Sequence, residues 1–337
     1  MPYPYTFPVQ LNMKFSEIEN LTMLGEFLCV SKVNLSTLLS NDDSATFCTK
    51  MAIPKKNTHL GFRIVYKVNN QILRNIHKVL QMHLNEMYFA PASVHGFVTD
   101  RNTRTNAQRH LAKKKILKLD IEDFFNSISD SDIARVLERI GCRSDVASWL
   151  AQLTTIEGKL VQGFNTSPVL ANMAFIDMDN LLESLSRKYQ SEFTRYADDI
   201  TISSDGELPS IAEVESILVN TQFRINKSKT KIMFRGENQF VTGLSVFDNK
   251  YPRVPKQFKR RIRLQLYYLN KYGGKSYVMR ETGISEIEAE TDYTKAEILH
   301  KRLIRVQYEI KGWIDYVNSI EPSLACRYYD IFNEIKW

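Results

Sequence analysis

The stretch FTRYADDITIS, residues 193–203, decides the fold. Aromatic and β-branched residues flank Ala197, Asp198 and Asp199, a pattern typical of two strands joined by a tight turn. Adjacent carboxylates in such a turn repel each other unless a cation neutralises them. An Asp-Asp pair is also common in ordinary turns, so the pair taken alone leaves a metal site and simple turn chemistry both open.

A third carboxylate comes from the segment ILKLDIEDFFNSI, residues 116–128. Residues 116–120 alternate between apolar and polar, which predicts a strand that ends at Asp120 and is followed by a helix through Asp123. If this strand lies beside the hairpin, three carboxylates form the hard oxygen ligand set that Mg²⁺ prefers. The sequence therefore predicts a clamp for two Mg²⁺ ions, suited to in-line nucleotidyl transfer.

The rest of the chain alternates strands and helices before a long helical end, which indicates an α+β fold. Periodicity and turn residues predict the following elements. Helices are expected at about 16–40, 71–87, 169–185, 209–220 and 256–337, the last broken at Gly273 and Gly274, and strands at about 51–67, 231–234 and 241–247.

Composition narrows the class of protein. The 337 residues are 43% hydrophobic and 25% charged, as in globular proteins, and no apolar run approaches the ~20 residues of a membrane span. The first ten residues lack the features of a signal peptide, and the four cysteines form no CxxC pair. We therefore expect a cytoplasmic protein without a zinc site or a disulfide framework.

Charge is distributed unevenly along the chain. Residues 50–118 and 221–275 each hold 14 Lys and Arg against 2 Asp and Glu, whereas residues 119–220 hold 7 against 18. A single charged run is often only a solvated surface. Two basic blocks on either side of an acidic centre instead suggest a polyanion gripped by two lobes, with cations bound between them.

These segments resemble the palm of reverse transcriptases. YADD within residues 193–203 is similar to the catalytic hairpin of that family, and residues 116–128 are similar to its first catalytic strand. VQGFNTSPVLANMAF, residues 161–175, resembles the nucleotide-pocket loop and helix that the family writes as QG, a spacer and SP. Phe164 departs from this pattern, in which a small residue is commoner after QG.

Three further strings resemble retron reverse transcriptases in particular. TNAQRH at 105–110 is similar to their Asn-Ala-x-x-His element, FVTGLSV at 240–246 to their Val-Thr-Gly element, and HGF at 95–97 to their fingers. The resemblance implies a right-hand polymerase fold of the α+β class. The parts it implies are an N-terminal helical extension (1–49), fingers (50–115), a catalytic palm (116–247) and a helical thumb (248–337).

The resemblance also assigns the catalytic residues. Asp120, Asp198 and Asp199 correspond to the metal ligands of the family. Lys229, in INKSKTKI, lies where the family has a lysine close to the leaving pyrophosphate, and a lysine there would act as a general acid. The alternative for Lys229 is an ordinary lysine at a strand edge.

Four more residues correspond to the nucleotide pocket. Arg63 resembles the fingers residue that grips the triphosphate, a role that suits its planar, bidentate guanidinium. Gln162 and Gly163 would line the incoming nucleotide. Phe125, five residues after Asp120, resembles the steric gate that crowds a ribose 2′-hydroxyl, although periodicity alone favours a core phenylalanine on an amphipathic helix.

Two segments are predicted to contact RNA. By resemblance, Asn106, Arg109 and His110 contact RNA or position the template. In residues 256–275, cations alternate with aromatic residues, which suits phosphate contacts and base stacking. A purely structural amphipathic helix is the alternative there. The cations expected to contact nucleic acid are Lys256, Lys259, Arg260 and Arg263.

The resemblance implies RNA-directed DNA synthesis from deoxynucleoside triphosphates. A retron enzyme would copy a structured non-coding RNA, starting from the 2′-hydroxyl of an internal guanosine, into branched multicopy single-stranded DNA for anti-phage defence. We expect a separate effector protein, because 337 residues leave no room for a fused effector domain. The alternatives are another bacterial reverse transcriptase, of the group II intron, diversity-generating or abortive-infection type, and a non-catalytic RNA-binding scaffold with a palm fold.

Overall fold

The computed structural model describes residues 13–41, 44–55 and 61–337, so the first ten residues lie outside the described part. The chain forms two compact units. The sheet unit comprises the residues up to Asn102 together with Lys114–Met233, and the helical unit comprises Thr103–Lys113 together with Phe234–Trp337. These units divide the chain at other positions than the predicted fingers, palm and thumb, whose boundaries stay predictions.

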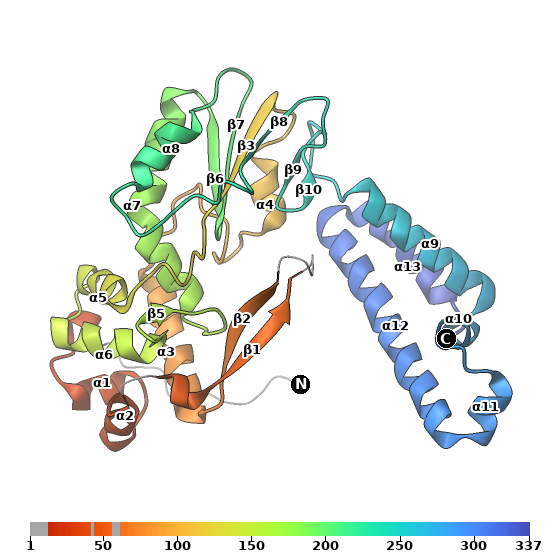
Figure 1. Ribbon diagram of the computed structural model, residues 1–337, viewed down its shortest axis with the longest axis horizontal. Helices are drawn as coiled ribbons and strands as arrows, with labels where there is room; N and C mark the ends of the chain where they lie inside the picture. The colour runs from red at the N-terminus through yellow and green to blue at the C-terminus, as the bar shows by residue number, and fades with distance from the viewer. Residues whose placement is uncertain (1–12, 42–43, 56–60) are drawn as a thin grey trace. The chain divides into compact units, whose positions relative to one another are not determined.

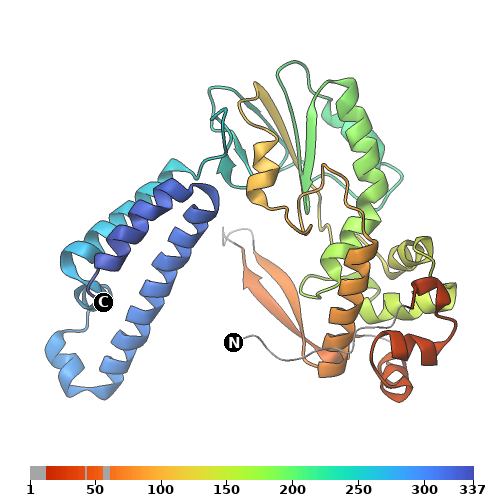
Figure 2. The ribbon, with the colours of Figure 1, turned by 180° about the vertical axis from the view of Figure 1, so that it is seen from behind.

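A four-stranded sheet in the order β6-β7-β3-β8 forms the centre of the sheet unit. Ile200 and Ile202 of β7 are fully buried, as expected for a central strand covered by helices. Figures 1 and 2 show α7 (Ser167–Lys188) and α8 (Ile211–Leu218) packed on one face of this sheet. The strands are β3 (Lys115–Asp120), β6 (Glu192–Tyr196), β7 (Asp199–Ser204) and β8 (Lys231–Phe234).

Helices and two short strand pairings surround that sheet within the sheet unit. β1 (Cys48–Pro54) and β2 (Phe62–Val68) pair antiparallel, and so do β4 (Thr155–Ile156) and β5 (Lys159–Leu160). Side chains of Asn20, Ser31, Asn70, Ser129 and Ser210 cap five helices and satisfy N–H groups that have no partner inside the helix. The helices are α1 (Leu21–Phe27), α2 (Lys32–Leu39), α3 (Gln71–Met87), α5 (Asp130–Arg139), α6 (Ser144–Thr154), α7 (Ser167–Lys188) and α8 (Ile211–Leu218).

The prediction of a helix through Asp123 is wrong. Residues 122–127 form turns, Asp123 has a φ of 41°, and α5 begins only at Asp130 behind the Ser129 capping box. The backbone N–H of Ile121 donates to Asp198 O, and that of Glu122 donates to Arg224 O. Because these N–H groups bond to segments distant in the sequence, they cannot take part in a local helix, and the amphipathic pattern does not produce one.

The helical unit begins with α4 (Thr103–Gln108), which lies against the paired strands β9 (Phe240–Val241) and β10 (Leu244–Ser245). Three of its remaining helices pack together and bury Leu266, Ile310 and Phe332. Gly273, with a φ of 77°, ends α9 at the predicted Gly-Gly break. The remaining helices are α9 (Lys256–Tyr272), α10 (Gly274–Thr282), α11 (Glu286–Thr291), α12 (Tyr293–Ile320) and α13 (Pro322–Glu334).

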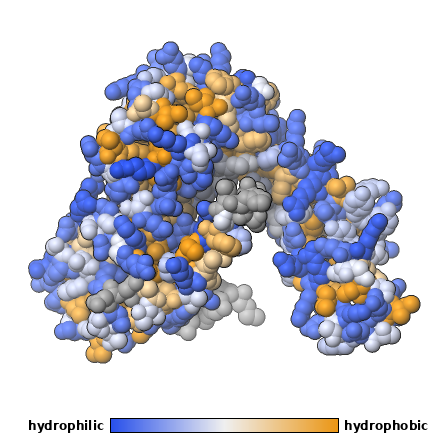
Figure 3. Space-filling view, in the orientation of Figure 1, coloured by the Kyte–Doolittle hydropathy of each residue, from blue (hydrophilic) through white to orange (hydrophobic). Residues whose placement is uncertain are grey.

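Most of the predicted elements are confirmed, including β8 and α3 at the predicted bounds and the hairpin of β6 and β7. Hydrophilic side chains cover most of the visible surface of each unit, interrupted by small apolar patches (Figure 3). None of the helices in the described ranges combines the length and apolar character needed to cross a membrane.

Candidate active site

Strand register brings the three predicted carboxylates to one end of the sheet. Asp198 lies in the turn between β6 and β7, and Asp199 is the first residue of β7. Asp199 pairs in register with Asp120, the last residue of β3. The N–H of Ile121 donates to Asp198 O at 3.0 Å, which ties the turn to the end of β3. The hairpin and the strand that ends at Asp120 therefore meet, as the sequence predicted.

The electrostatics of this cluster favour a bound cation. Burial raises the pKa of Asp198, and the charges of Asp120 and Asp199 raise it further. Lys229 Nζ donates to Asp120 Oδ2 at 2.8 Å, and Lys118 Nζ lies 3.7 Å from Asp199 Oδ2. Burial alone would lower the pKa of Lys229, but its bond to Asp120 and the charges of Asp120, Asp198 and Asp199 together outweigh burial, and the pKa lies above its ordinary value. Lys229 is thus held protonated.

The donor set fits a divalent metal ion in chemistry, since it consists of carboxylate oxygens at a partly exposed site. In the described residues, no three His, Cys, Asp or Glu side chains converge into a closed metal-binding group. Lysines instead engage Asp120 and Asp199. To bind an ion together, the Asp120 and Asp199 side chains must rotate away from Lys229 and Lys118. Their backbones are already neighbours in the sheet.

The Gln162–Gly163 loop lies against β2 of the sheet unit. Tyr66 N donates to Gln162 O at 2.8 Å. Gly163 has a φ of 110°, and a Cβ there would lie 2.2 Å from Tyr66 O, so only glycine fits. Arg63 is exposed on the same strand, three residues from Tyr66. The loop and the predicted triphosphate residue are therefore linked through one backbone hydrogen bond and one strand.

Phe125 lies in the turns after β3 and is half-buried. Its ring lies 5.6 Å from that of Phe124, which is the buried core residue, and 6.1 Å from that of Phe97. The helix that motivated the core interpretation of Phe125 is absent. Phe97 has a φ of 60° and a partly exposed ring, and the sequence analysis placed it in the fingers-like HGF string without linking it to Phe125.

Phe164 points away from the loop surface. Its side chain is buried, and its ring lies 4.5 Å from that of His77, which is also buried. The residue that departs from the family pattern therefore packs into the core of the sheet unit. Gly163, its neighbour, remains exposed.

Two of the three retron-like strings, residues 105–110 and 240–246, meet in the helical unit. Asn106 Nδ2 donates to Thr242 Oγ1 at 3.5 Å, and Thr242 Oγ1 donates to Thr103 O at 2.9 Å. Asn106 and His110 are buried, whereas Arg109 is exposed. The placement of Asn106 and His110 suits positioning of this segment, and Arg109 is the member of the trio that presents its side chain at the surface.

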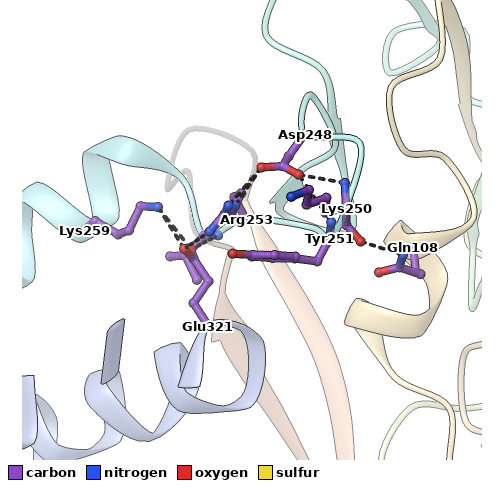
Figure 4. Close-up of polar contacts among 8 residues, drawn as sticks. Gln108, Asp248, Lys250, Tyr251, Arg253, Lys259 and Glu321 are labelled. Carbon is purple, nitrogen blue, oxygen red and sulfur yellow. Dashed lines mark hydrogen bonds and ion pairs between the residues drawn. The ribbon is translucent and has the colours of Figure 1, made fainter. Parts of the chain in front are cut away.

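Three of the four predicted α9 cations are exposed. Lys256, Arg260 and Arg263 point to solvent, while Lys259 Nζ donates to Glu321 Oε1 at 3.1 Å. Figure 4 shows that Glu321 also bonds Arg253. A groove of about 400 Å³ runs along these cations. The residues that line it are Lys256, Gln257, Lys259, Arg260, Arg263, Leu324 and Tyr328.

Sequence reasoning missed a buried charge pair behind the hairpin. Arg195 of β6 and Asp179 of α7 are both fully buried and form a bidentate ion pair. A charged residue inside each of two apolar segments was the available signal, because buried charges are rare unless paired. Lys118, beside Asp199, was also missed.

Comparison with known proteins identifies the family. The model of the family "Reverse transcriptase (RNA-dependent DNA polymerase)" matches residues 53–269, well over half of the chain. The chain therefore belongs to the reverse transcriptase family. This membership, together with the observed mixture of helices and strands, confirms the predicted α+β polymerase fold. As a family, reverse transcriptases use divalent metal ions.

Curated relatives point to the retron branch. The chain is 30% identical over 238 residues to the Retron Mx65 reverse transcriptase of Myxococcus xanthus. The matched region covers 64% of this chain and 54% of that protein. The chain is 28% identical over 284 residues to the Retron Mx162 reverse transcriptase of the same organism, covering 72% and 57%. The Retron Ec86 reverse transcriptase of Escherichia coli is 25% identical over 274 residues, covering 80% and 76%.

These likenesses confirm the prediction of a retron-type bacterial reverse transcriptase. The chain spans little more than half the length of the two Myxococcus relatives.

Proposed function

We propose that this protein is an RNA-directed DNA polymerase that copies a structured non-coding RNA into branched multicopy single-stranded DNA. The observation that carries the proposal is the meeting of Asp120, Asp198 and Asp199 at one end of the sheet, in a chain of the reverse transcriptase family. The similarity to retron enzymes supports a retron system. In such a system the protein would act in anti-phage defence together with a separate effector protein. A cytoplasmic location remains a prediction.

Asp120, Asp198 and Asp199 would hold two Mg²⁺ ions. Bound there, the ions would make the attacking hydroxyl more acidic and neutralise charge on the triphosphate. In the reaction the hydroxyl oxygen forms a bond to the α-phosphorus, the bond to pyrophosphate breaks, and the hydroxyl proton is released. Lys229, kept protonated beside Asp120, donates a proton to the leaving pyrophosphate and is reprotonated from solvent.

The sheet unit would also select the nucleotide. Arg63 grips the triphosphate through its guanidinium fork, and the Gln162–Gly163 backbone lines the pocket. Phe125 crowds the 2′ position of the sugar. The bond between Tyr66 N and Gln162 O supports this arrangement, because it links the strand that carries Arg63 to the loop.

The helical unit would recognise RNA. Lys256, Arg260 and Arg263 offer exposed cations along one groove, with Lys259 partly engaged by Glu321. Arg109 contacts RNA directly, and Asn106 and His110 position its segment from the interior. Phosphate contacts supply affinity, while the shape of the structured RNA supplies selectivity.

The test is to purify the chain with the nucleic acid that accompanies it, sequence that nucleic acid, and supply deoxynucleoside triphosphates with Mg²⁺. We expect one structured RNA and a DNA product joined to it through a 2′ linkage. Extension of any primed template without such an RNA would favour another type of bacterial reverse transcriptase. RNA binding without synthesis would favour the scaffold, and Asp198→Asn serves as the inactive control.

A further inference from the structure

Arg195 is the largest fully buried side chain in the described residues. It lies on β6, three residues before Asp198. Its Nε and Nη2 donate to the two carboxylate oxygens of Asp179 at 2.7 and 2.6 Å. Its Nη1 donates to Asn172 Oδ1 at 3.1 Å and to the carbonyl of Ala197 at 3.0 Å. The guanidinium therefore joins α7 to the backbone of the catalytic turn.

Asn172 extends this network to the other side of the turn. Its Nδ2 donates to Gly96 O at 2.9 Å. A Cβ on Gly96 would lie 2.3 Å from Ala197 N, so the backbone of Gly96 lies directly against the turn. Arg195 N also donates to Ser93 O, and His95 N donates to Arg195 O. The turn is thus held by α7 on one side and by residues 93–96 on the other.

Ala197 is the residue that this network constrains. It has a φ of 56°, in the left-handed region that non-glycine residues rarely adopt. Its carbonyl is fixed by Arg195, and its N–H side faces Gly96. Such backbone conformations persist when the surrounding structure over-determines them. Because Asp198 and Asp199 follow directly, the conformation of Ala197 sets the direction in which both carboxylates leave the backbone.

Stability alone does not account for a buried charge pair at this place. Apolar residues of similar volume are often as stabilising as a buried ion pair, since both charges must lose their hydration. Phe124 and Phe175 already enclose the guanidinium, with its carbon 5.7 and 4.8 Å from their ring centres. What an apolar side chain cannot supply is a planar set of donors that bonds Asp179, Asn172 and Ala197 at once.

We propose that Arg195, Asp179 and Asn172 are positioning residues that hold Ala197 in its left-handed conformation and thereby aim Asp198 and Asp199 at the metal ions. The inference rests on the proposed function. Its consequence is that the network controls metal affinity and the rate of the chemical step, while nucleotide and RNA binding depend on other residues. Outer partners of metal ligands commonly change affinity or activity by about 10- to 100-fold when they are removed.

Three variants separate positioning from packing. Arg195→Lys keeps the charge and the pairing with Asp179 but lacks the fork that reaches Ala197 and Asn172. Arg195→Met with Asp179→Leu replaces the whole pair by apolar side chains, and Asn172→Ala removes the bridging amide. Thr154→Val is the matched control, because Thr154 is fully buried in α6 and bonds only carbonyls of its own helix.

Each folded variant is titrated with Mn²⁺ by electron paramagnetic resonance, without nucleotide, and its thermal unfolding is followed by circular dichroism. Steady-state kinetics with Mg²⁺ then separates kcat from KM for the nucleotide. We expect all three variants to bind Mn²⁺ about tenfold or more weakly and to lose a similar factor in kcat. KM and RNA affinity should stay within about twofold of wild type, and Thr154→Val should match wild type throughout.

Wild-type Mn²⁺ affinity and kcat in folded Arg195→Met with Asp179→Leu would overturn the inference, because packing alone would then suffice. If that double variant does not fold, Arg195→Lys and Asn172→Ala decide by the same two measurements. A wild-type protein that neither binds Mn²⁺ nor synthesises DNA would contradict the proposed function instead, so the two failures are distinguishable.

Discussion

Two arginines, one in each unit, form ion pairs with quite different consequences. Arg195 and Asp179 in the sheet unit are completely buried, and Arg195 also bonds the Asn172 side chain and the Ala197 carbonyl. Arg253 in the helical unit is 34% exposed and bonds Asp248 and Glu321 (Figure 4). Burial makes the first arrangement rigid, whereas solvent and salt weaken the second.

The predicted functional residues of the two units differ in the same way, in how firmly the structure holds them. The sheet unit offers a small number of carboxylates and loops held in place by backbone hydrogen bonds and strand register. The helical unit offers exposed cations that act by charge. We therefore expect changes in the sheet unit to affect chemistry sharply and changes in the helical unit to affect RNA affinity gradually.

The largest effect is expected for Asp198→Asn. The variant loses a metal ligand but no phosphate contact, so DNA synthesis should fall at least about a thousandfold, equivalent to roughly 4 kcal/mol of transition-state stabilisation. Primer extension and filter binding measure synthesis and RNA affinity side by side. RNA affinity and thermal stability should stay near wild type. Extension at the wild-type rate in Mg²⁺ would contradict the assignment of the carboxylates.

Gly163→Ala tests the rigidity of the sheet unit, with Gly236→Ala of the helical unit as its control. Both glycines have a φ near 105–110°, but a Cβ on Gly236 meets nothing within 4 Å, whereas one on Gly163 lies 2.2 Å from Tyr66 O. Gly236→Ala should therefore lose only about 1–2 kcal/mol of unfolding free energy, because its added Cβ strains the backbone at positive φ but meets no other atom.

For Gly163→Ala we expect a further loss of about 2 kcal/mol in unfolding free energy and a rise in KM for the nucleotide, because the loop must move from β2. Urea unfolding and steady-state kinetics give both quantities. Equal losses for the two glycines would mean that the contact with Tyr66 has no influence on the pocket.

The double variant Arg260→Ala with Arg263→Ala tests whether the exposed cations of the helical unit bind RNA. Both side chains are exposed along the α9 groove, unlike Lys259, which is paired with Glu321. Losing two phosphate contacts should reduce the slope of log affinity against log salt by about two units, or somewhat less on single-stranded RNA. Lys301→Ala, an exposed α12 cation paired with Glu297, is the control.

Synthesis on the cognate RNA should fall far more than extension on a simple primed template. An equal loss on both templates would show that α9 binds any template duplex without selectivity. It would contradict a retron-specific role for the helix.

The smallest effect is expected for Phe125→Ala. Removing a half-buried ring beside Phe97 should open space near the 2′ carbon and raise incorporation of ribonucleotides relative to deoxyribonucleotides by several-fold to about tenfold. Competition between the two nucleotides measures the ratio. A loss of ~3 kcal/mol in stability without any change in the ratio would favour a packing role for Phe125.

Local patterns in the sequence predicted much of the site. The YADD hairpin, the strand that ends at Asp120 and the helix after Pro168 follow from alternation, turn residues and helix periodicity, which act between near neighbours. The segment after Asp120 escaped such reasoning, because Ile121 and Glu122 bond Asp198 and Arg224 far along the chain. The role of Glu321 as an acceptor for Lys259 was hidden for the same reason.

The sequence by itself determined the family and the α+β class and predicted the three carboxylates as metal ligands, because each inference depends on residue identity and short-range spacing. Only the tertiary structure decided which charges are buried and which are exposed. It joined Arg195 to Asp179 and Asn172, placed Gly96 against Ala197, and brought Asn106 to Thr242. Such contacts connect residues that are distant in the chain, and burial, which decides the strength of their electrostatic interactions, exists only once the chain has folded.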